Sequence, residues 1–192
     1  MSGPTTAGDG PVSPRARRPG LRALARASLA LGAVLFLAAV AGHAAGVRFN
    51  YTDSLPRGLY LASEFDPATA GPGVLVEACP SREAAQAVAG YLPNGPCPGG
   101  VIRLGKEIAA LPGDRVVVDS AGVVVGGLRV PNSAPLFYDR AGRPLSPHLG
   151  EVVLGPDEYW LHSGRVGTSI DSRYVGPVSD VRSRLRPLLV ED

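Results

Sequence analysis

A mainly-β domain with one short helix, preceded by a single transmembrane helix, is the fold class predicted by this sequence of 192 residues. Its 25 Gly and 19 Pro residues, with no internal repeat, are typical of many turns and short strands. An uncharged apolar run, residues 27–47, is long enough to cross a bilayer as a helix. The segment 81–89 is the one later stretch with the pattern of a soluble helix.

Residues 1–26 combine Gly, Pro, Ser and Thr with five arginines and a single acid. With little apolar surface to bury, they are predicted to form a disordered, basic, cytoplasmic tail. The positive-inside rule then places the N-terminus in the cytoplasm and residues 48–192 outside, which in a bacterium means the periplasm of the inner membrane. A cleaved secretory signal is the alternative to a retained, lipid-contacting anchor at 27–47, but its apolar core is usually shorter.

After residue 48, short apolar runs alternate with Gly and Pro, and they predict eight strands. The predicted strands are 58–63, 73–77, 101–111, 115–119, 122–125, 128–130, 158–162 and 181–190. Ser81 is the expected N-cap of the short helix, and Gly90 stands where helices commonly stop. Residues 132–155 carry few periodic signals and are predicted to be a long loop.

Cys79 and Cys97 are the only cysteines. In an exported domain such a pair is expected to form a disulfide, which would stabilise the fold by about 3 kcal/mol in the chain-entropy model. Zinc binding and a thiol nucleophile are the alternatives. Neither is favoured, because no histidine accompanies the two thiols.

Ser54 lies two residues before Pro56 and four before Gly58, so the chain is predicted to turn where this hydroxyl is presented. An ordinary turn after a membrane helix has the same pattern. The motif therefore indicates a candidate nucleophile only in combination with a suitable base.

Lys106 is the only lysine among 19 basic residues. Arginine cannot be deprotonated inside a protein, whereas a desolvated lysine can, so Lys106 is a candidate for chemistry that arginine cannot perform. Period-2 alternation places it on one strand face with Ile108 and Ala110, where apolar neighbours should lower its pKa towards that of a general base. The alternative is a solvated lysine on a hairpin that turns at 112–113.

Ser169, Asp171 and Arg173 belong to a dense polar segment that ends at Gly176 and Pro177. Such a cluster is usually a solvated turn. Its functional interpretation is a set of side chains that holds a catalytic base in place by hydrogen bonds.

The order Ser-x-Pro-x-Gly-x-Tyr, Lys-x-Ile-x-x-Leu-Pro-Gly-Asp and Ser-x-Asp-Ser-Arg-Tyr-x-Gly-Pro resembles the type I signal peptidases over residues 48–190. It is most similar to their TraF-type branch in conjugative plasmid transfer, and the segment from Cys79 to Cys97 resembles that branch alone. The resemblance implies a signal-peptidase-like β domain. One departure is His162-Ser163-Gly164, where general signal peptidases read Gly-Asp-Asn, and it affects the expected loop geometry and substrate contacts.

Carried over to this chain, the resemblance implies that Ser54 is the nucleophile and Lys106 its general base. It further implies that Thr52 and the backbone N–H of Ser54 stabilise the oxyanion. Ser169 would orient the lysine, and Asp171 with Arg173 would form a supporting ion pair. The expected partner is a preprotein or a propilin, cleaved without a metal or an organic cofactor.

Two other functions fit parts of the sequence: a non-catalytic, membrane-anchored binding module of the envelope, and a self-cleaving regulator with a Ser/Lys dyad. The presence of both Ser54 and Lys106 disfavours the first. The apolar segment and the lack of a DNA-binding helix pair disfavour the second. A formal net charge of +2 gives no support for nucleic-acid binding. His148 and His162 are expected to be structural, because they fit no metal-ligand or triad spacing.

Overall fold

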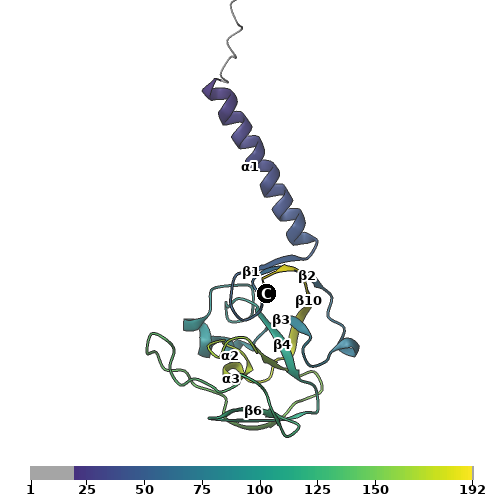
Figure 1. The fold of residues 1–192 in the computed structure, drawn as a ribbon, viewed down its shortest axis with the longest axis vertical. Coiled ribbons are helices and arrows are strands. Elements are labelled where there is room, and N and C mark those ends of the chain that lie inside the picture. Colours follow the sequence, from purple (N-terminus) through teal and green to yellow (C-terminus); the bar gives the residue numbers. More distant parts are fainter. Residues whose placement is uncertain (1–19, 192) are drawn as a thin grey trace, which may run out of the picture. The chain divides into compact units, whose positions relative to one another are not determined.

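Strands dominate the computed structural model, which describes residues 20–191, and they form two antiparallel sheets. The mainly-β prediction is therefore confirmed. The larger sheet has the order β1 (Val47–Asn50), β2 (Gly58–Ser63), β10 (Asp180–Val190), β3 (Leu75–Cys79), β4 (Leu104–Ala110) and β9 (Trp160–His162). The smaller sheet has the order β7 (Leu128–Arg129), β6 (Gly122–Val125), β5 (Arg115–Asp119) and β8 (Gly150–Val153). In Figure 1 the strand β6 lies at the end of the domain opposite β1 and β2.

The core is divided between the two sheets, and β9 contributes to both parts. Leu161 packs with Val76 and Ile108 in the core of the larger sheet. Trp160, its neighbour in sequence, instead packs with Val116 under the smaller sheet. Side chains that alternate along a strand point to opposite faces, so one short strand connects the two apolar clusters.

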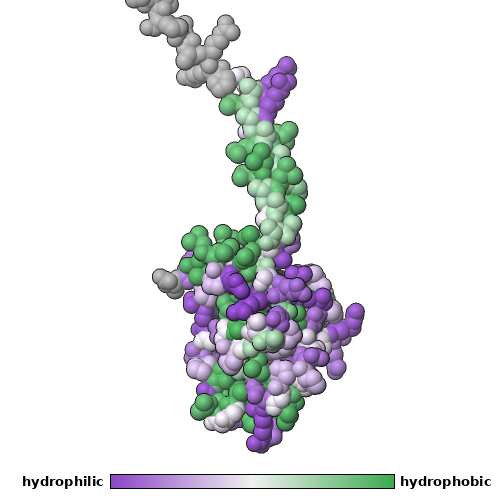
Figure 2. Space-filling view, turned by 90° about the vertical axis from the view of Figure 1, so that its right-hand side faces the viewer, coloured by the Kyte–Doolittle hydropathy of each residue, from purple (hydrophilic) through white to green (hydrophobic). Residues whose placement is uncertain are grey.

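The helix α1 (Leu21–Ala44) has no buried residue, and its surface is mainly hydrophobic (Figure 2). Its 24 residues give a length of about 36 Å, enough to cross a bilayer. This helix and the β domain that follows it are separate compact units.

The predicted bounds of the N-terminal segments need correction. The apolar run was expected to be helical over 27–47, but α1 begins at Leu21, because Leu, Ala and Arg are all strong helix formers. It ends at Ala44, and Val47 pairs with Leu61 in β1 instead. Residues 21–26 are thus helical and not part of a disordered tail. The rest of the predicted tail, residues 1–19, lies outside the described residues.

Three further elements were absent from the sequence prediction. The first is β1, a four-residue strand whose first residue, Val47, was assigned to the apolar run. The second is β8, which pairs with β5 inside the predicted loop 132–155 and is too short to show a period. The third is the single-turn helix α3 (Ser172–Val175), which Asp171 caps by accepting a hydrogen bond from the Arg173 backbone N–H. The domain therefore contains more than one short helix.

The expected helix is present as α2 (Arg82–Val88), and Ser81 caps it through a hydrogen bond from the backbone N–H of Ala84 to its hydroxyl oxygen. It continues into the 3₁₀ turn η2 (Ala89–Tyr91), so Gly90 lies inside a turn and not at a stop. A second 3₁₀ turn, η1 (Pro67–Thr69), lies before β3. A disulfide joins Cys79 at the end of β3 to Cys97, with their Cα atoms 5.4 Å apart.

Candidate active site

A cleft of about 750 Å³ lies at the larger sheet and is lined by four of the residues that the sequence singled out. The loop between β1 and β2 brings Thr52 and Ser54 to it, and β4 brings Lys106. Ser169 reaches it from the segment before α3. Three stretches that are far apart in sequence thus meet in one cavity.

The loop that carries Ser54 is held by the side chain of Asn50, the last residue of β1. Its Oδ1 accepts hydrogen bonds from the backbone N–H and the hydroxyl of Thr52, at 3.2 and 2.8 Å. Its Nδ2 donates to the carbonyl oxygens of Thr52, Leu55 and Pro56, at 2.9, 3.0 and 3.1 Å. Asn commonly organises a turn in this way, and one amide here fixes the backbone on both sides of Ser54.

Thr52 is exposed, and its hydroxyl donates to Asn50 in the free protein. A hydroxyl carries a single hydrogen, so this donor is already engaged. The expected role of Thr52 at an oxyanion therefore requires its hydroxyl to turn away from Asn50 when substrate binds.

Ser54 makes two contacts with the segment that precedes α3. Its Oγ lies 3.0 Å from Oγ of Ser169, and its carbonyl oxygen accepts a hydrogen bond of 2.8 Å from the hydroxyl of Ser163. Ser163 and Ser169 are both buried. The Ser54 side chain and backbone are therefore both tied to the opposite wall of the cleft.

Lys106 faces inward from β4, on which buried and half-buried residues alternate strictly. It shares the inner face with Leu104 and Ile108, and only 4% of the residue is exposed. Burial lowers the pKa of Lys106 to about 8, since the negative charge of Asp171 only partly opposes this effect and Arg173 adds to it. Its Nζ donates to the carbonyl of Gly105 at 3.1 Å, while the Ser169 hydroxyl, expected beside the lysine, is hydrogen-bonded to Ser54 instead.

Asp171 and Arg173 form a fully buried, two-pronged ion pair, with both N···O distances at 2.8 Å. The remaining guanidinium hydrogens go to the carbonyl oxygens of Ala134, Gly167 and Ser169, so all five donors have acceptors. Burial alone would raise the pKa of Asp171, but His162 and Arg173 together lower it to about 2. The pair also fixes the loop that carries Ser169.

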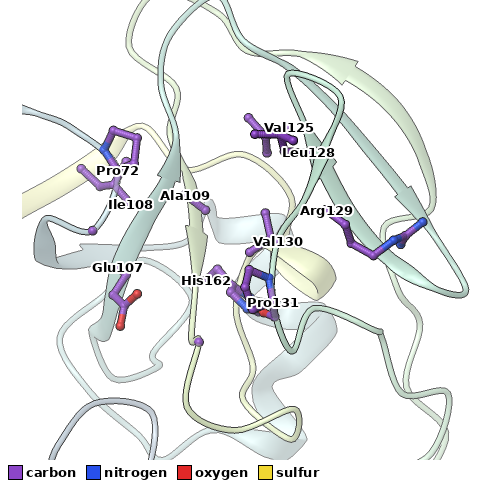
Figure 3. Close-up of a pocket in the computed structure, with 12 residues that line it drawn as sticks. Pro72, Glu107, Ile108, Ala109, Val125, Leu128, Arg129, Val130, Pro131 and His162 are labelled. Carbon is purple, nitrogen blue, oxygen red and sulfur yellow. The ribbon is translucent and has the colours of Figure 1, made fainter.

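His162 connects this polar cluster to the smaller sheet. Its Nδ1 lies 3.3 Å from Oδ2 of Asp171, without the alignment of a hydrogen bond, and its Nε2 lies 3.1 Å from the carbonyl oxygen of Pro131. It also lines a second cavity, of about 370 Å³. Figure 3 shows His162 beside Pro131, with Val125 and Leu128 at the other end of this cavity. The lining of this cavity includes neither Ser54 nor Lys106.

Within residues 20–191, no three His, Cys, Asp or Glu side chains gather where they could hold a metal ion. The geometry instead combines a hydroxyl, an amine of lowered pKa and a buried ion pair. Those are the components of nucleophilic catalysis with a neutral lysine as base.

Sequence reasoning missed two residues of this arrangement, Asn50 and Ser163. Asn50 stands two residues before Thr52, the spacing of an Asx turn, and that signal could have identified it. Ser163 lies in the triplet noted for its departure from general signal peptidases. Its role depends on a backbone carbonyl 109 positions away, which no local pattern encodes.

Comparison with known proteins identifies the family of this chain. The family model for signal peptidase, peptidase S26, matches residues 21–183. A plasmid transfer protein TraF of Escherichia coli is 37% identical over 175 residues, covering 88% of this chain and 97% of the relative. A conjugal transfer protein TraF of Agrobacterium tumefaciens (strain 15955) is 42% identical over 154 residues, covering 78% and 85%. The chain therefore belongs to the signal peptidase family, peptidase S26.

Proposed function

We propose that this protein is a membrane-anchored serine endopeptidase in which Ser54 is the nucleophile and Lys106 the general base. The observation that carries the proposal is a buried lysine with a pKa of about 8 in the same cleft as a serine hydroxyl. A general base is most effective when its pKa lies near the working pH. An ordinary lysine would be almost entirely protonated there.

The mechanism follows from this arrangement. Neutral Lys106 takes the proton of Ser54, and the resulting alkoxide attacks the carbonyl carbon of the scissile bond. The backbone N–H of Ser54 and the hydroxyl of Thr52 hold the oxyanion, and such a donor contributes about 3–4 kcal/mol to the transition state. Protonated Lys106 then gives its proton to the leaving amine, and water resolves the acyl-enzyme.

The proposed setting is the bacterial inner membrane, with α1 as a single-pass anchor, the N-terminus in the cytoplasm and the β domain in the periplasm. The length and apolar surface of α1 support an anchor. The relatives are named as a plasmid transfer protein and a conjugal transfer protein, which favours a role in conjugative transfer. The proposed substrate is therefore a leader peptide or a pilin-like precursor.

Cleavage of candidate precursors by the detergent-solubilised chain tests this function. Wild type and Ser54→Ala are incubated with a propilin and with a general preprotein, and the products are identified by mass. We expect wild type to cut and Ser54→Ala to lose activity by about 10⁴-fold or more, because the nucleophile is gone. If Ser54→Ala cuts as fast as wild type, the proposed nucleophile is wrong. If wild type binds a precursor without cutting it, the protein is a binding module.

Asn50→Asp is expected to lower kcat by about 10- to 100-fold, with a similar KM. The carboxylate still accepts from Thr52, but it cannot donate to the three carbonyl oxygens that Nδ2 now holds. The loop then no longer presents Ser54 at a fixed position, and small misplacements of this kind are costly.

Steady-state kinetics of Asn50→Asp and Asn50→Ala test the role of Asn50. Asn50→Gln places the amide one methylene farther from the backbone, so the amide no longer lies where it can donate to the same carbonyl oxygens. This variant should therefore be slower than wild type. An unchanged kcat in Asn50→Asp would mean that the loop keeps its shape without these bonds.

A further inference from the structure

One wall of the cleft is formed by a segment that carries no proposed catalytic group. Residues 91–103, between α2 and β4, line the cleft through Leu92, Pro93, Pro96 and Ile102 among others. These four side chains are aliphatic or proline and are at least partly exposed. A partly exposed apolar wall beside a nucleophile is a surface for contact with a ligand.

This wall is held rigidly by its own backbone and by the disulfide. Residues 93–102 fold back on themselves, with hydrogen bonds of 2.9 Å from Ile102 N–H to Pro93 O and from Gly95 N–H to Gly100 O. The disulfide from Cys97 ties the bend to β3. A Cβ atom at Gly95 would lie 2.4 Å from Cα of Ile102, so glycine permits the two arms of the bend to meet.

The wall is also fixed at both ends. Arg103 forms an ion pair with Glu77 of β3 at 3.5 Å. At the other end, the Tyr91 hydroxyl donates to the carbonyl of Pro144, and Arg143 donates to the carbonyl of Gly90 at 2.7 Å. A segment held at the disulfide and at both ends presents its side chains in a defined position.

Ile102 lines the cleft, whereas Val101 before it and Leu104 two residues after it are buried. Val101 before it packs with both cysteines in a small buried cluster, and Leu104 belongs to the main core. Ile102 itself lines the cleft, with its position set by the backbone hydrogen bond to Pro93. Its aliphatic side chain offers no hydrogen bond, so only an apolar group gains free energy by contact with it.

We propose that segment 91–103, which the disulfide at Cys97 ties to β3, is the substrate-recognition wall of the cleft, and that Ile102 selects an aliphatic side chain of the bound polypeptide. The proposal deepens the proposed function, because it takes the occupant of the cleft to be a polypeptide substrate. The disulfide then sets specificity as well as stability, since it fixes the bend that carries Pro96 and ends at Ile102.

Binding by an inactive variant tests this selection independently of catalysis. The full-length Ser54→Ala chain in mild detergent is titrated with blocked nine-residue alanine peptides that carry Leu, Asp or Lys at one position, scanned along the peptide. We expect one position in the peptide at which Leu gives binding about tenfold or more tighter than Asp or Lys. A single apolar contact typically gives discrimination of this size. Adding Ile102→Asp should abolish that preference for Leu and favour Lys.

Leu128→Asp is the matched control, because Leu128 is 77% exposed and does not line this cleft. It should leave the peptide ranking unchanged. Cys79→Ala/Cys97→Ala, used at a temperature where its unfolding curve shows a folded domain, should weaken Leu discrimination as Ile102→Asp does. An identical ranking in Ser54→Ala with and without Ile102→Asp overturns the proposal. Failure of wild type to cleave any precursor would instead overturn the proposed function, since peptide binding does not require cleavage.

Discussion

Lys106→Arg is expected to lower kcat/KM by about 10⁴-fold or more, although it keeps a positive charge at the same position. Arginine cannot lose its proton in a protein, so the proposed base would disappear while the charge remains. Removing one member of a nucleophile–base pair typically lowers the catalytic rate about as much as removing both members. The measurement is the initial rate of precursor cleavage, compared with Arg129→Lys on the smaller sheet, which should cleave as wild type does.

The pH dependence of wild type gives a second readout of the same group. As the proposed base, Lys106 would act only when neutral, and its neutral fraction increases as the pH rises through the pKa of about 8. The rate should therefore rise tenfold per pH unit below that value and level off above it. A profile that is flat from about pH 6 to 9, or a Lys106→Arg variant that cleaves normally, would contradict the proposed mechanism.

Arg173→Met is expected to destabilise the domain by about 3–5 kcal/mol, which is a large part of the stability of a typical domain. The substitution leaves the Asp171 carboxylate buried without its main partner. Three backbone carbonyls also lose their donors. Urea unfolding measures the loss, with the fluorescence of Trp160, the sole tryptophan and fully buried, as the signal.

Two further variants show whether the loss of stability in Arg173→Met comes from breaking the buried ion pair or simply from removing a charge. Arg182→Ala breaks an exposed pair with Asp180 and should cost less than about 1 kcal/mol. Asp171→Leu/Arg173→Met removes both buried charges and should be more stable than Arg173→Met alone. The lowered pKa of Asp171 also predicts that its contribution is present above about pH 4, the unfolded value, and is lost as the pH falls towards about 2. Equal losses in Arg173→Met and Arg182→Ala would refute this account.

Much of the fold could be predicted, because many strands are bounded by turn residues. The bounds of β2, β5 and β6 were predicted correctly, since Gly, Pro and Asp separate these short apolar runs. β1 was missed because it has only four residues, and the first of them, Val47, was assigned to the apolar run. β8 was missed because four residues are too few to show a period.

The sequence likewise identified some residues of the candidate site and missed others. Ser54, Lys106 and Ser169 were identified by residue type and motif order, and the structure brings them into one cleft. Asn50 was not, although its partners are local and its spacing to Thr52 is that of an Asx turn. Ser163 could not be identified, because its partner is the backbone carbonyl of a residue 109 positions away, and only the folded structure brings the two together.

The order of strands in the larger sheet has a consequence for when the candidate site can form. The loop with Ser54 belongs to the β1–β2 hairpin and Lys106 to β4, but β10, the last strand in the sequence, lies between β2 and β3. A chain still emerging from the ribosome therefore contains both side chains before the strand that joins their two parts of the sheet has been made. On the proposed mechanism, synthesis itself delays the onset of cleavage until residues 180–190 are in place.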